Sequence, residues 1–565
     1  MQTNDKKNLS YLPLIYGMFF ILLGLLLLIR YQPFANDDVF IYFNYARNMA
    51  EGRFFAYDVR NIPSEGFTSL LYLLLLTPFE FFNINMMFAT FIINLMAIIL
   101  TCYLFYRLLI QMQILSSSGV MLVIAVFVAI LMSDPNIITN LNWGLETFLS
   151  PLIVFSAALA IAYACPPHAD KRAVNAFFVL LFLAYLIRPE TIAFLGLFGV
   201  PILYSIKPHR KQVIVALIGF GVVFVTYHAL KYLIFGDILP TGFYRKVGGE
   251  TLGGLRYVLN WMIDHSIPVM ICVILTVIVP DFRAVFKRRS VWLLLGVSLV
   301  TLLFFIGTNP LIGTGYRFLM NVTFTLYSLI AVGVGLFVEK RLNLSDKFLT
   351  RALAGITVVF VLLMPVIADG NLLKAINIYA RADRSVSQHF YVQFGEYLHQ
   401  SLSTPEEITL VFGDAGAIPY ALQGTFIDTN GLTEPPLARL FRQPDSPEKI
   451  ATYVDHILSY DPEIVVLAWG ATAEGVSQTQ VNTHSPFDVP TPIELYTAYD
   501  DHNIIYACSL EFYYDLHIGL WRDSPHYDEL NAAISTICDE QGYILENGLT
   551  ITDGNLSIRF DVDKD

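Results

Sequence analysis

Long apolar runs recur through the first two thirds of the chain and alternate with short polar segments. A helix rises about 1.5 Å per residue, so about 18–20 apolar residues span the roughly 30 Å hydrocarbon core of a bilayer. The runs predict eleven crossings, near residues 11–29, 86–109, 119–133, 147–165, 174–187, 190–206, 212–235, 266–280, 290–307, 318–338 and 349–368. The pattern therefore predicts a polytopic α-helical membrane protein.

The basic residues between these runs predict how the helices are oriented. Lys/Arg clusters stay on the cytoplasmic side of a membrane, and the clear clusters lie at 171–172, 207–211, 283–289 and 340–347. Two apolar runs lie between one cluster and the next, as a hairpin out of the cytoplasm and back requires. Because eleven is an odd number of crossings, an N-terminus inside the cytoplasm predicts a C-terminus outside it. One further apolar stretch, 67–82, would invert every later loop if it crossed. We therefore predict that it lies in the outer interface or re-enters without crossing.

Charge divides the chain near residue 369. Residues 369–565 carry 30 acidic and 9 basic side chains, whereas residues 1–368 carry 17 and 26. This asymmetry predicts a transmembrane domain at 1–368 and a separate soluble domain at 369–565 outside the cytoplasm. Strand-like and helical stretches alternate in the tail, which predicts an α/β domain with a mostly parallel sheet. Nucleic acid is excluded as a partner, because binding its phosphates needs a basic surface.

Two adjacent carboxylates, Asp37 and Asp38, stand out in the predicted first outer loop, residues 30–66, which also contains Arg47 and Glu65. Such a pair can supply a general base or hold a divalent cation. The alternative is that the pair caps a helix beginning at Val39, which aspartate does well. Cys/His spacing typical of a metal site does not occur in the sequence.

Further polar residues recur where the apolar runs reach the predicted outer face. They are Glu146, Arg188, Glu190, Tyr244, Arg245, Lys246 and Arg317. Ionisable groups at membrane depth are costly and usually pair or serve a function. Arg245, Lys246 and Arg317 have the chemistry to hold a phosphate, and interface anchoring is the alternative for each one alone. The segment Gly413-Asp414-Ala415-Gly416 lacks the pattern of a phosphate loop and is interpreted as a tight strand-to-helix turn.

Taken together, several segments resemble a bacterial family of GT-C glycosyltransferases that includes the mycobacterial terminal arabinofuranosyltransferases. The segments that carry the resemblance are 37–41, 45–52, 65–69, 144–147, 188–190, 239–246, 316–318, 413–420 and 430–435. The family usually has a Pro-Asn-Thr-(aromatic)-Tyr-Ala-Lys run where this chain has Thr241, Gly242 and Arg245. That departure leaves the identity of the sugar open.

The resemblance implies an inverting transferase in the bacterial plasma membrane that takes its sugar, for which the family suggests arabinofuranose, from a polyprenyl-phosphate donor. Asp37 would match the catalytic base and Asp38 its partner, while Lys246, Arg245, Arg317 and Tyr244 would bind the donor phosphate. Arg47, Glu65, Glu146, Arg188 and Glu190 would shape the site. The acceptor would be a glycan, a lipid or a protein outside the cytoplasm, and no cofactor is firmly implied.

Two other functions are weighed against this one. A transporter would show paired repeats with matching broken helices, which the sequence lacks, and its polar residues would gather at the membrane midplane. A non-catalytic scaffold or receptor would use its acidic tail to bind a partner, and Asp37 would then be dispensable.

Overall fold

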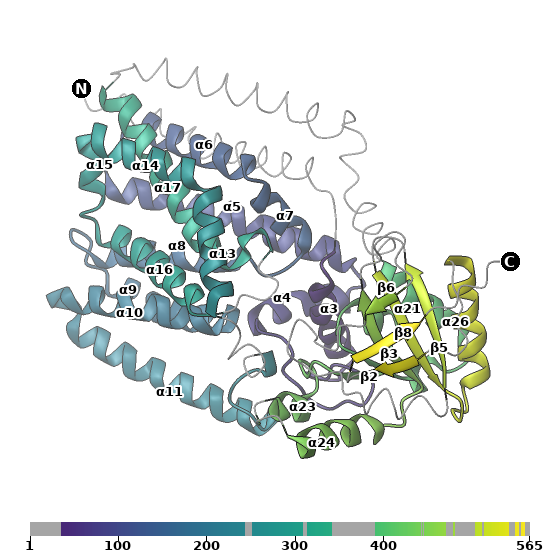
Figure 1. Ribbon diagram of the computed structural model, residues 1–565. Coiled ribbons are helices and arrows are strands. Elements are labelled where there is room, and N and C mark those ends of the chain that lie inside the picture. The colour runs from purple at the N-terminus through teal and green to yellow at the C-terminus, as the bar shows by residue number, and fades with distance from the viewer. Residues whose placement is uncertain are drawn as a thin grey trace.

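The computed structural model describes residues 35–242, 251–308, 314–341, 390–441, 443, 446–470, 478–480, 503–510, 514–541, 549–552 and 555–559. A long helical bundle is followed by a smaller part that contains the sheets and adjoins one end of the bundle (Figure 1). The predicted crossings at 11–29 and 349–368 lie outside the described residues, as do Tyr244, Arg245 and Lys246.

The other nine predicted crossings each fall on a helix. These helices are α5 (Met86–Met112), α6 (Ser117–Ser133), α8 (Leu149–Ala164), α9 (Lys171–Ile187), α10 (Pro189–Ser205), α11 (Arg210–Phe235), α14 (Ser266–Ile278), α16 (Arg289–Ile306) and α17 (Met320–Leu336). Within the described residues, four helical segments are long and apolar enough to cross a membrane alone, or six if each of two bent pairs forms one span. The protein is thus a membrane protein, and the number of eleven crossings stays a prediction.

The two bent pairs contain helices that the apolar pattern did not predict. Helix α6 continues after a 71° bend into α7 (Pro135–Trp143), and α13 (Thr251–Asp264) continues after a 63° bend into α14. Asp134 caps α7 by accepting a hydrogen bond from the backbone N–H of Asn136 at 2.8 Å, and a proline opens that helix. A proline fits the first helical position but not an interior one, so the chain bends here.

Helix α4 (Leu70–Phe81) corresponds to the surplus apolar stretch. Its 12 residues extend for about 18 Å, which is too short to cross the hydrocarbon core. Leu74, Leu75 and Phe81 are exposed along it, so this helix presents an apolar face outward. The length fits the predicted placement in the interface.

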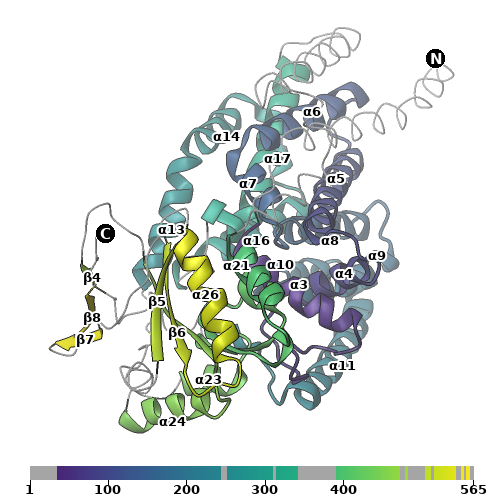
Figure 2. The same cartoon turned by 90° about the vertical axis from the view of Figure 1, so that its right-hand side faces the viewer.

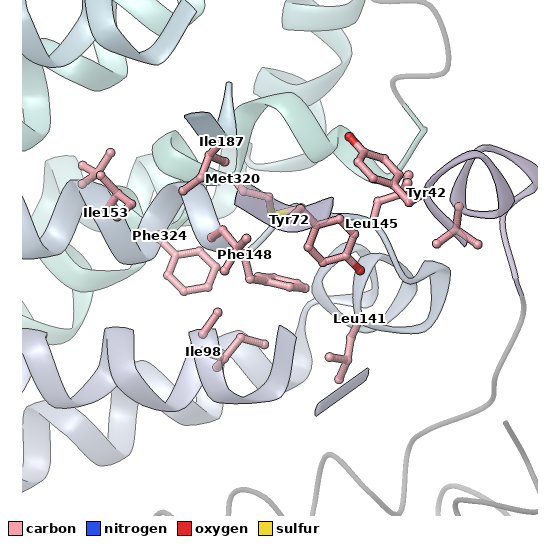
Figure 3. Close-up of a cluster of buried hydrophobic side chains, with 14 of the residues drawn as sticks. Tyr42, Tyr72, Ile98, Leu141, Leu145, Phe148, Ile153, Ile187, Met320 and Phe324 are labelled. Carbon is pink, nitrogen blue, oxygen red and sulfur yellow. The ribbon is translucent and has the colours of Figure 1, made fainter. Parts of the chain in front are cut away.

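The core of the bundle is built from aromatic and branched side chains on α5, α8 and α17. Figure 3 shows Phe148, Ile153 and Phe324 in this core, with Tyr42 of α3 (Asp37–Ala50) and Tyr72 of α4 toward one end of it. The rings of Tyr42 and Tyr72 lie 5.2 Å apart at their centroids in an edge-to-face arrangement, which aromatic pairs favour. The packed core therefore continues directly into the region where Asp37 lies.

The tail contains a five-stranded sheet in the order β2-β1-β3-β6-β5. Strands β2 (Thr425–Asp428), β1 (Thr409–Phe412) and β3 (Ile464–Gly470) are parallel, whereas β6 (Tyr514–Trp521) pairs antiparallel with both β3 and β5 (Asn503–Leu510). The predicted mostly parallel sheet is therefore wrong for the β6 and β5 side, where the sheet is mixed.

Helices and a second, small sheet complete the tail. They are α21 (Phe390–Ser401), α22 (Ala417–Leu422), α23 (Pro435–Leu440), α24 (Pro447–Leu458) and α26 (Tyr527–Gln541), with β4 (Gln478–Gln480), β8 (Asn555–Arg559) and β7 (Leu549–Thr552) in the small sheet. Figure 2 shows α21 and α26 beside the larger sheet. The side chains of Cys508 and Cys538, between which a disulfide is possible, lie outside the described residues.

The tail is docked on the first loop of the bundle. Arg60 pairs with Glu434 of the tail at 2.9 Å and with Asp58 of its own loop at 2.7 Å. Asp58 in turn accepts a hydrogen bond from the backbone N–H of Phe426 in β2 at 2.9 Å. Since these groups are largely buried, the tail is held in a defined position over the end of the bundle that carries α3.

Candidate active site

Asp37 and Asp38 open helix α3, but neither caps it. The cap is Asn36, whose side-chain oxygen accepts a hydrogen bond from the backbone N–H of Asp38 at 2.9 Å. The hypothesis that the aspartates cap this helix is therefore wrong. Both occupy the first turn, where the positive end of the helix dipole favours negative charge.

The tail covers Asp37 directly. The turn between β1 and α22 places the backbone N–H of Ala417 2.9 Å from Asp37 Oδ1, as a hydrogen-bond donor. In the same turn the carboxyl group of Asp414 is hydrogen-bonded to that of Asp37. The interpretation of the segment 413–416 as a strand-to-helix turn is confirmed, and the structure adds that this turn closes over the candidate base.

The two carboxyl groups influence each other's protonation. Burial raises the pKa of Asp37 above its ordinary value, although the hydrogen bonds from Asp414 and Ala417 oppose this rise. Burial also raises the pKa of Asp414 far above its ordinary value, and the negative charge of Asp37 adds to the rise. Two carboxylates in contact resist double ionisation, and Asp414, whose pKa is raised by burial and by the charge of Asp37, is the member of the pair that favours its protonated form.

Asp38 faces a different partner, Arg317. Arg317 Nη2 lies 3.5 Å from Asp38 Oδ2, and the arginine side chain is only 9% exposed. Arg317 belongs to the short helix η2 (Thr314–Leu319), where Gly315 and Tyr316 have positive φ angles of 64° and 52° and turn the chain sharply before α17. The turn directs Arg317 toward the start of α3.

A second arginine lies close by, at the junction of α9 and α10. Arg188 is extended, as expected for a residue that precedes a proline, and forms ion pairs with Glu146 at 3.1 Å and Glu190 at 2.7 Å. Arg188 and Arg317 both lie over the ring of Phe318, at 4.5 and 4.8 Å from its centroid. The ring therefore holds two guanidinium groups near each other.

These groups surround a pocket next to Asp38. Its lining residues include Thr147, Ser150, Arg188, Glu190, Arg317, Phe318 and Asn321. Among the described residues, Nε of Arg317 and Oδ1 of Asn321 are buried without a hydrogen-bond partner. Buried polar atoms normally have a partner, so the pocket wall offers an unused donor and an unused acceptor to a polar group.

Arg47 and Glu65, which were predicted to shape the site, contact other parts of the protein. Arg47 donates to Asn44 and lies 4.5 Å from the ring centroid of Tyr420 in α22. Glu65 forms a buried ion pair with Lys231 of α11 at 2.7 Å. These residues tie α3 and its loop to their neighbours, and any effect on the pocket passes through α3.

Tyr244, Arg245 and Lys246 follow Thr241 in the sequence and lie outside the described residues. Thr241 itself lies where the first loop meets the tail, because its hydroxyl group is within hydrogen-bonding distance of the backbone carbonyls of Glu65 and Leu432. The role predicted for those three residues stays a prediction.

The divalent cation considered for Asp37 and Asp38 also stays a prediction. In the described part of the chain, no three His, Cys, Asp or Glu side chains are grouped to hold a metal ion. The two carboxylates face different partners, Asp414 and Arg317, so this arrangement fits a base and an ion pair better than a chelating pair.

Sequence reasoning missed Asp414. It lies 377 positions after Asp37, and the two meet only because the tail docks onto the first loop. The available signal was the acidic residue between two glycines after a strand, which marks a turn where backbones approach closely.

Comparison with known proteins supports the fold. Residues 377–506 match a family described as a domain of unknown function, DUF8728, and no curated protein sequence matches the chain. The structure is similar to ArnT from Cupriavidus metallidurans, solved bound to undecaprenyl phosphate and in the apo state. The two share 12% identity with a TM-score of 0.53, covering 89% of this chain and 97% of that one.

A second similar structure is the archaeal oligosaccharyltransferase AglB from Archaeoglobus fulgidus, in complex with an inhibitory peptide and a dolichol-phosphate. It shares 11% identity with a TM-score of 0.47, covering 91% of this chain and 74% of that one. The likeness to ArnT shows that this chain has the membrane-embedded GT-C fold. The relation to the arabinofuranosyltransferases stays a prediction.

Proposed function

We propose that this protein, which has the GT-C fold, is an inverting glycosyltransferase that takes its sugar from a polyprenyl-phosphate donor. The acceptor would lie outside the cytoplasm, at the bacterial plasma membrane. One observation carries the proposal: a buried carboxylate, Asp37, heads helix α3, and its neighbour Asp38 pairs with Arg317, which lines a pocket together with Arg188. A base beside an anion pocket is the arrangement that transfer from a sugar phosphate requires.

In the proposed reaction, an acceptor hydroxyl oxygen attacks the anomeric carbon of the sugar. A new carbon–oxygen bond forms while the bond from that carbon to the phosphate oxygen breaks, and the electron pair leaves with the phosphate. The hydroxyl proton passes to Asp37, and the products are the inverted glycoside and polyprenyl phosphate. The raised pKa of Asp37 suits this role, because a base works best when its pKa approaches the working pH.

The leaving phosphate gains negative charge as the bond breaks, and fixed cations stabilise that charge. Arg317 is suited to it, since its Nε is unpaired among the described residues and its contact with Asp38 is long. Arg188 adds a second positive charge, although Glu146 and Glu190 already neutralise much of it. The undecaprenyl phosphate bound in the ArnT structure supports the same donor class. Tyr244, Arg245 and Lys246 are proposed to complete the phosphate site.

The sugar and the acceptor form the finer part of the proposal. Arabinofuranose is the first sugar to test, because the segments that resemble the arabinofuranosyltransferases include the whole neighbourhood of Asp37. The acceptor is a glycan, lipid or protein of the cell envelope.

Purified protein in lipid nanodiscs tests the proposal. It would be incubated with a panel of polyprenyl-phosphate sugars, arabinofuranose and hexoses among them, plus envelope extracts as acceptors. Mass spectrometry would measure released polyprenyl phosphate and the glycosylated product. We expect wild type to act on one donor and Asp37→Asn to lose about 10²–10⁴-fold in rate, the usual contribution of a general base.

The matched control is Glu51→Gln, which neutralises an exposed carboxylate at the other end of α3 and should leave the rate unchanged. Full activity in Asp37→Asn would exclude Asp37 as the base. Wild-type protein that neither cleaves nor binds any donor would contradict the transferase function and favour a transporter or a scaffold.

A further inference from the structure

The turn that carries Asp414 is held against α3 from several sides. Tyr57 of the first loop donates a hydrogen bond to the carbonyl of Ala415, and Asn430 donates one to the carbonyl of Gly413. Tyr420 of α22 packs against Phe40 of α3, with ring centroids 5.4 Å apart. The position of the turn is therefore set by both the bundle and the tail.

The backbone of the turn lies so close to Asp37 that no side chain fits between them at Gly416. A Cβ atom added to Gly416 would overlap the Asp37 carboxylate. A glycine is thus required where the backbone approaches the candidate base. With the Ala417 N–H on Oδ1, the turn surrounds one side of the carboxylate with backbone and leaves Asp414 as the ionisable neighbour from the tail.

We propose that Asp414 is a positioning residue: its carboxyl group donates a hydrogen bond to Asp37 and, with the Ala417 N–H, fixes the orientation of the base. The proposal rests on the proposed transfer reaction. It means that the base is complete only when the tail is docked, so that the extracytoplasmic domain supplies part of the site and not just a surface for the acceptor.

The neighbouring charges agree with a donor role for Asp414. The groups that face this pair are Asp38 on α3, Arg317 paired with Asp38, and the hydroxyl of Tyr57 on the first loop. Asp37 and Asp38 are both acidic and disfavour a second negative charge on Asp414. A neutral donor beside an ionised acceptor is the arrangement in which two close carboxyl groups are most stable.

Asp414→Asn and Asp414→Ala separate hydrogen-bond donation from other roles. The amide of asparagine can still donate to Asp37 but cannot ionise. We expect Asp414→Asn to keep the wild-type rate within about threefold, and Asp414→Ala to lose about tenfold or more, the usual worth of a hydrogen bond to a charged group. Asp523→Asn, at an exposed acid of the tail, is the control and should act as wild type.

The pH profile provides a readout that a merely structural residue would not move. In the wild type, ionisation of Asp414 at high pH removes the donor, so kcat/KM should fall on the alkaline side. In Asp414→Asn that fall should disappear or move to higher pH. An unchanged profile in Asp414→Asn, or wild-type activity in Asp414→Ala, would overturn the proposal. A rate in Asp414→Asn as low as in Asp37→Asn would also overturn it.

Infrared spectroscopy tests the pair without any turnover. At neutral pH the wild type should show the carbonyl stretch of a buried protonated carboxyl group that is missing from Asp414→Asn. If the wild type transfers no sugar but shows this band, the proposed function fails while the pairing stands. If the difference spectrum shows no lost band, Asp414 is not the protonated partner and the inference fails, whatever the activity.

Discussion

The side chain of Arg317 has surroundings that suit it to bind an anion. Its guanidinium group is nine-tenths buried, lies over Phe318 and reaches Asp38 only at 3.5 Å. A hydrogen bond at that distance is weak, so a phosphate that binds Arg317 has to replace only a weak contact with Asp38. The planar fork of arginine also matches the geometry of a phosphate, which the ammonium group of lysine does not.

We therefore expect Arg317→Lys to raise the KM for the donor and Arg317→Gln to lower kcat/KM further, by about 10–100-fold, the worth of a charge-assisted hydrogen bond. Initial rates at varied donor concentration would measure both. Arg172→Gln, at an exposed position at the start of α9, is the control. Unchanged kinetics in Arg317→Gln would remove this residue from the phosphate site.

At the residue scale, the sequence was informative wherever a polar group interrupts an apolar run. Arg188, Glu190 and Glu146 were singled out on this basis as polar groups at the predicted outer face, and the structure joins them by ion pairs. Asp414 could not be found in this way, since its partner Asp37 is brought to it only by docking of the tail. Arg47 and Glu65, which the resemblance implied as site-shaping residues, are not among the lining residues of the pocket, and their role stays a prediction.

At the scale of elements, the apolar pattern predicted helices that run straight and missed those that bend. Both bent pairs meet at polar residues: Asp134 at the end of α6 lies 3.6 Å from His265 at the start of α14, and Tyr327 donates to Asp134 at 2.8 Å. Helices α7 and α13 are shorter and more polar than a full span, so hydropathy alone does not detect them. The antiparallel pairs of β6 with β5 and with β3 were missed, although β5 and β6 follow each other closely in the sequence, as the strands of a hairpin do.

The turn from β1 to α22 gives a prediction at this scale. Gly416→Ala would force its new methyl group into the Asp37 carboxylate, so either the carboxylate or the turn must shift. We expect transfer activity to fall at least tenfold and stability to fall by about 1–3 kcal/mol, as for other overpacked sites. Transfer assays and thermal unfolding would measure these effects.

The control for that variant is Gly219→Ala in α11, where an added Cβ meets nothing within 4 Å. It should be neutral or slightly stabilising, since alanine favours a helix more than glycine does. If Gly416→Ala kept full activity, the close approach of the turn to Asp37 would not matter for the reaction.

For the whole molecule, the central relation is the docking of the acidic tail on the bundle. Arg60 is its main ionic link, since it bridges Asp58 and Glu434 and also donates to the carbonyl of Phe426. Glu434 is further bonded to His456. Burial would raise the pKa of Glu434, but the hydrogen bond with His456 and the charge of Arg60 outweigh burial and lower it. Glu434 therefore stays ionised from neutral pH down to values below its ordinary pKa, and its ion pair with Arg60 is lost only when the pH falls further.

Removing Arg60 should detach the tail while leaving the bundle folded. Arg60→Ala leaves two buried carboxylates without their cation, and breaking a buried pair in this way costs about 3–5 kcal/mol. We expect faster hydrogen exchange in β1 and β2, and loss of transfer activity because Asp414 and Ala417 leave Asp37. Donor binding should persist, since Arg188 and Arg317 belong to the bundle.

Two variants make this outcome decisive. Glu434→Gln removes one charge of the link but keeps its shape, so it should lie between wild type and Arg60→Ala in both exchange and activity. Arg522→Ala changes an exposed arginine of the tail and should behave as wild type. A tail that exchanges freely in Arg60→Ala while transfer continues at the wild-type rate would mean that the bundle alone completes the site. Loss of both exchange protection and activity, with donor binding kept, would instead mean that docking of the tail assembles the base.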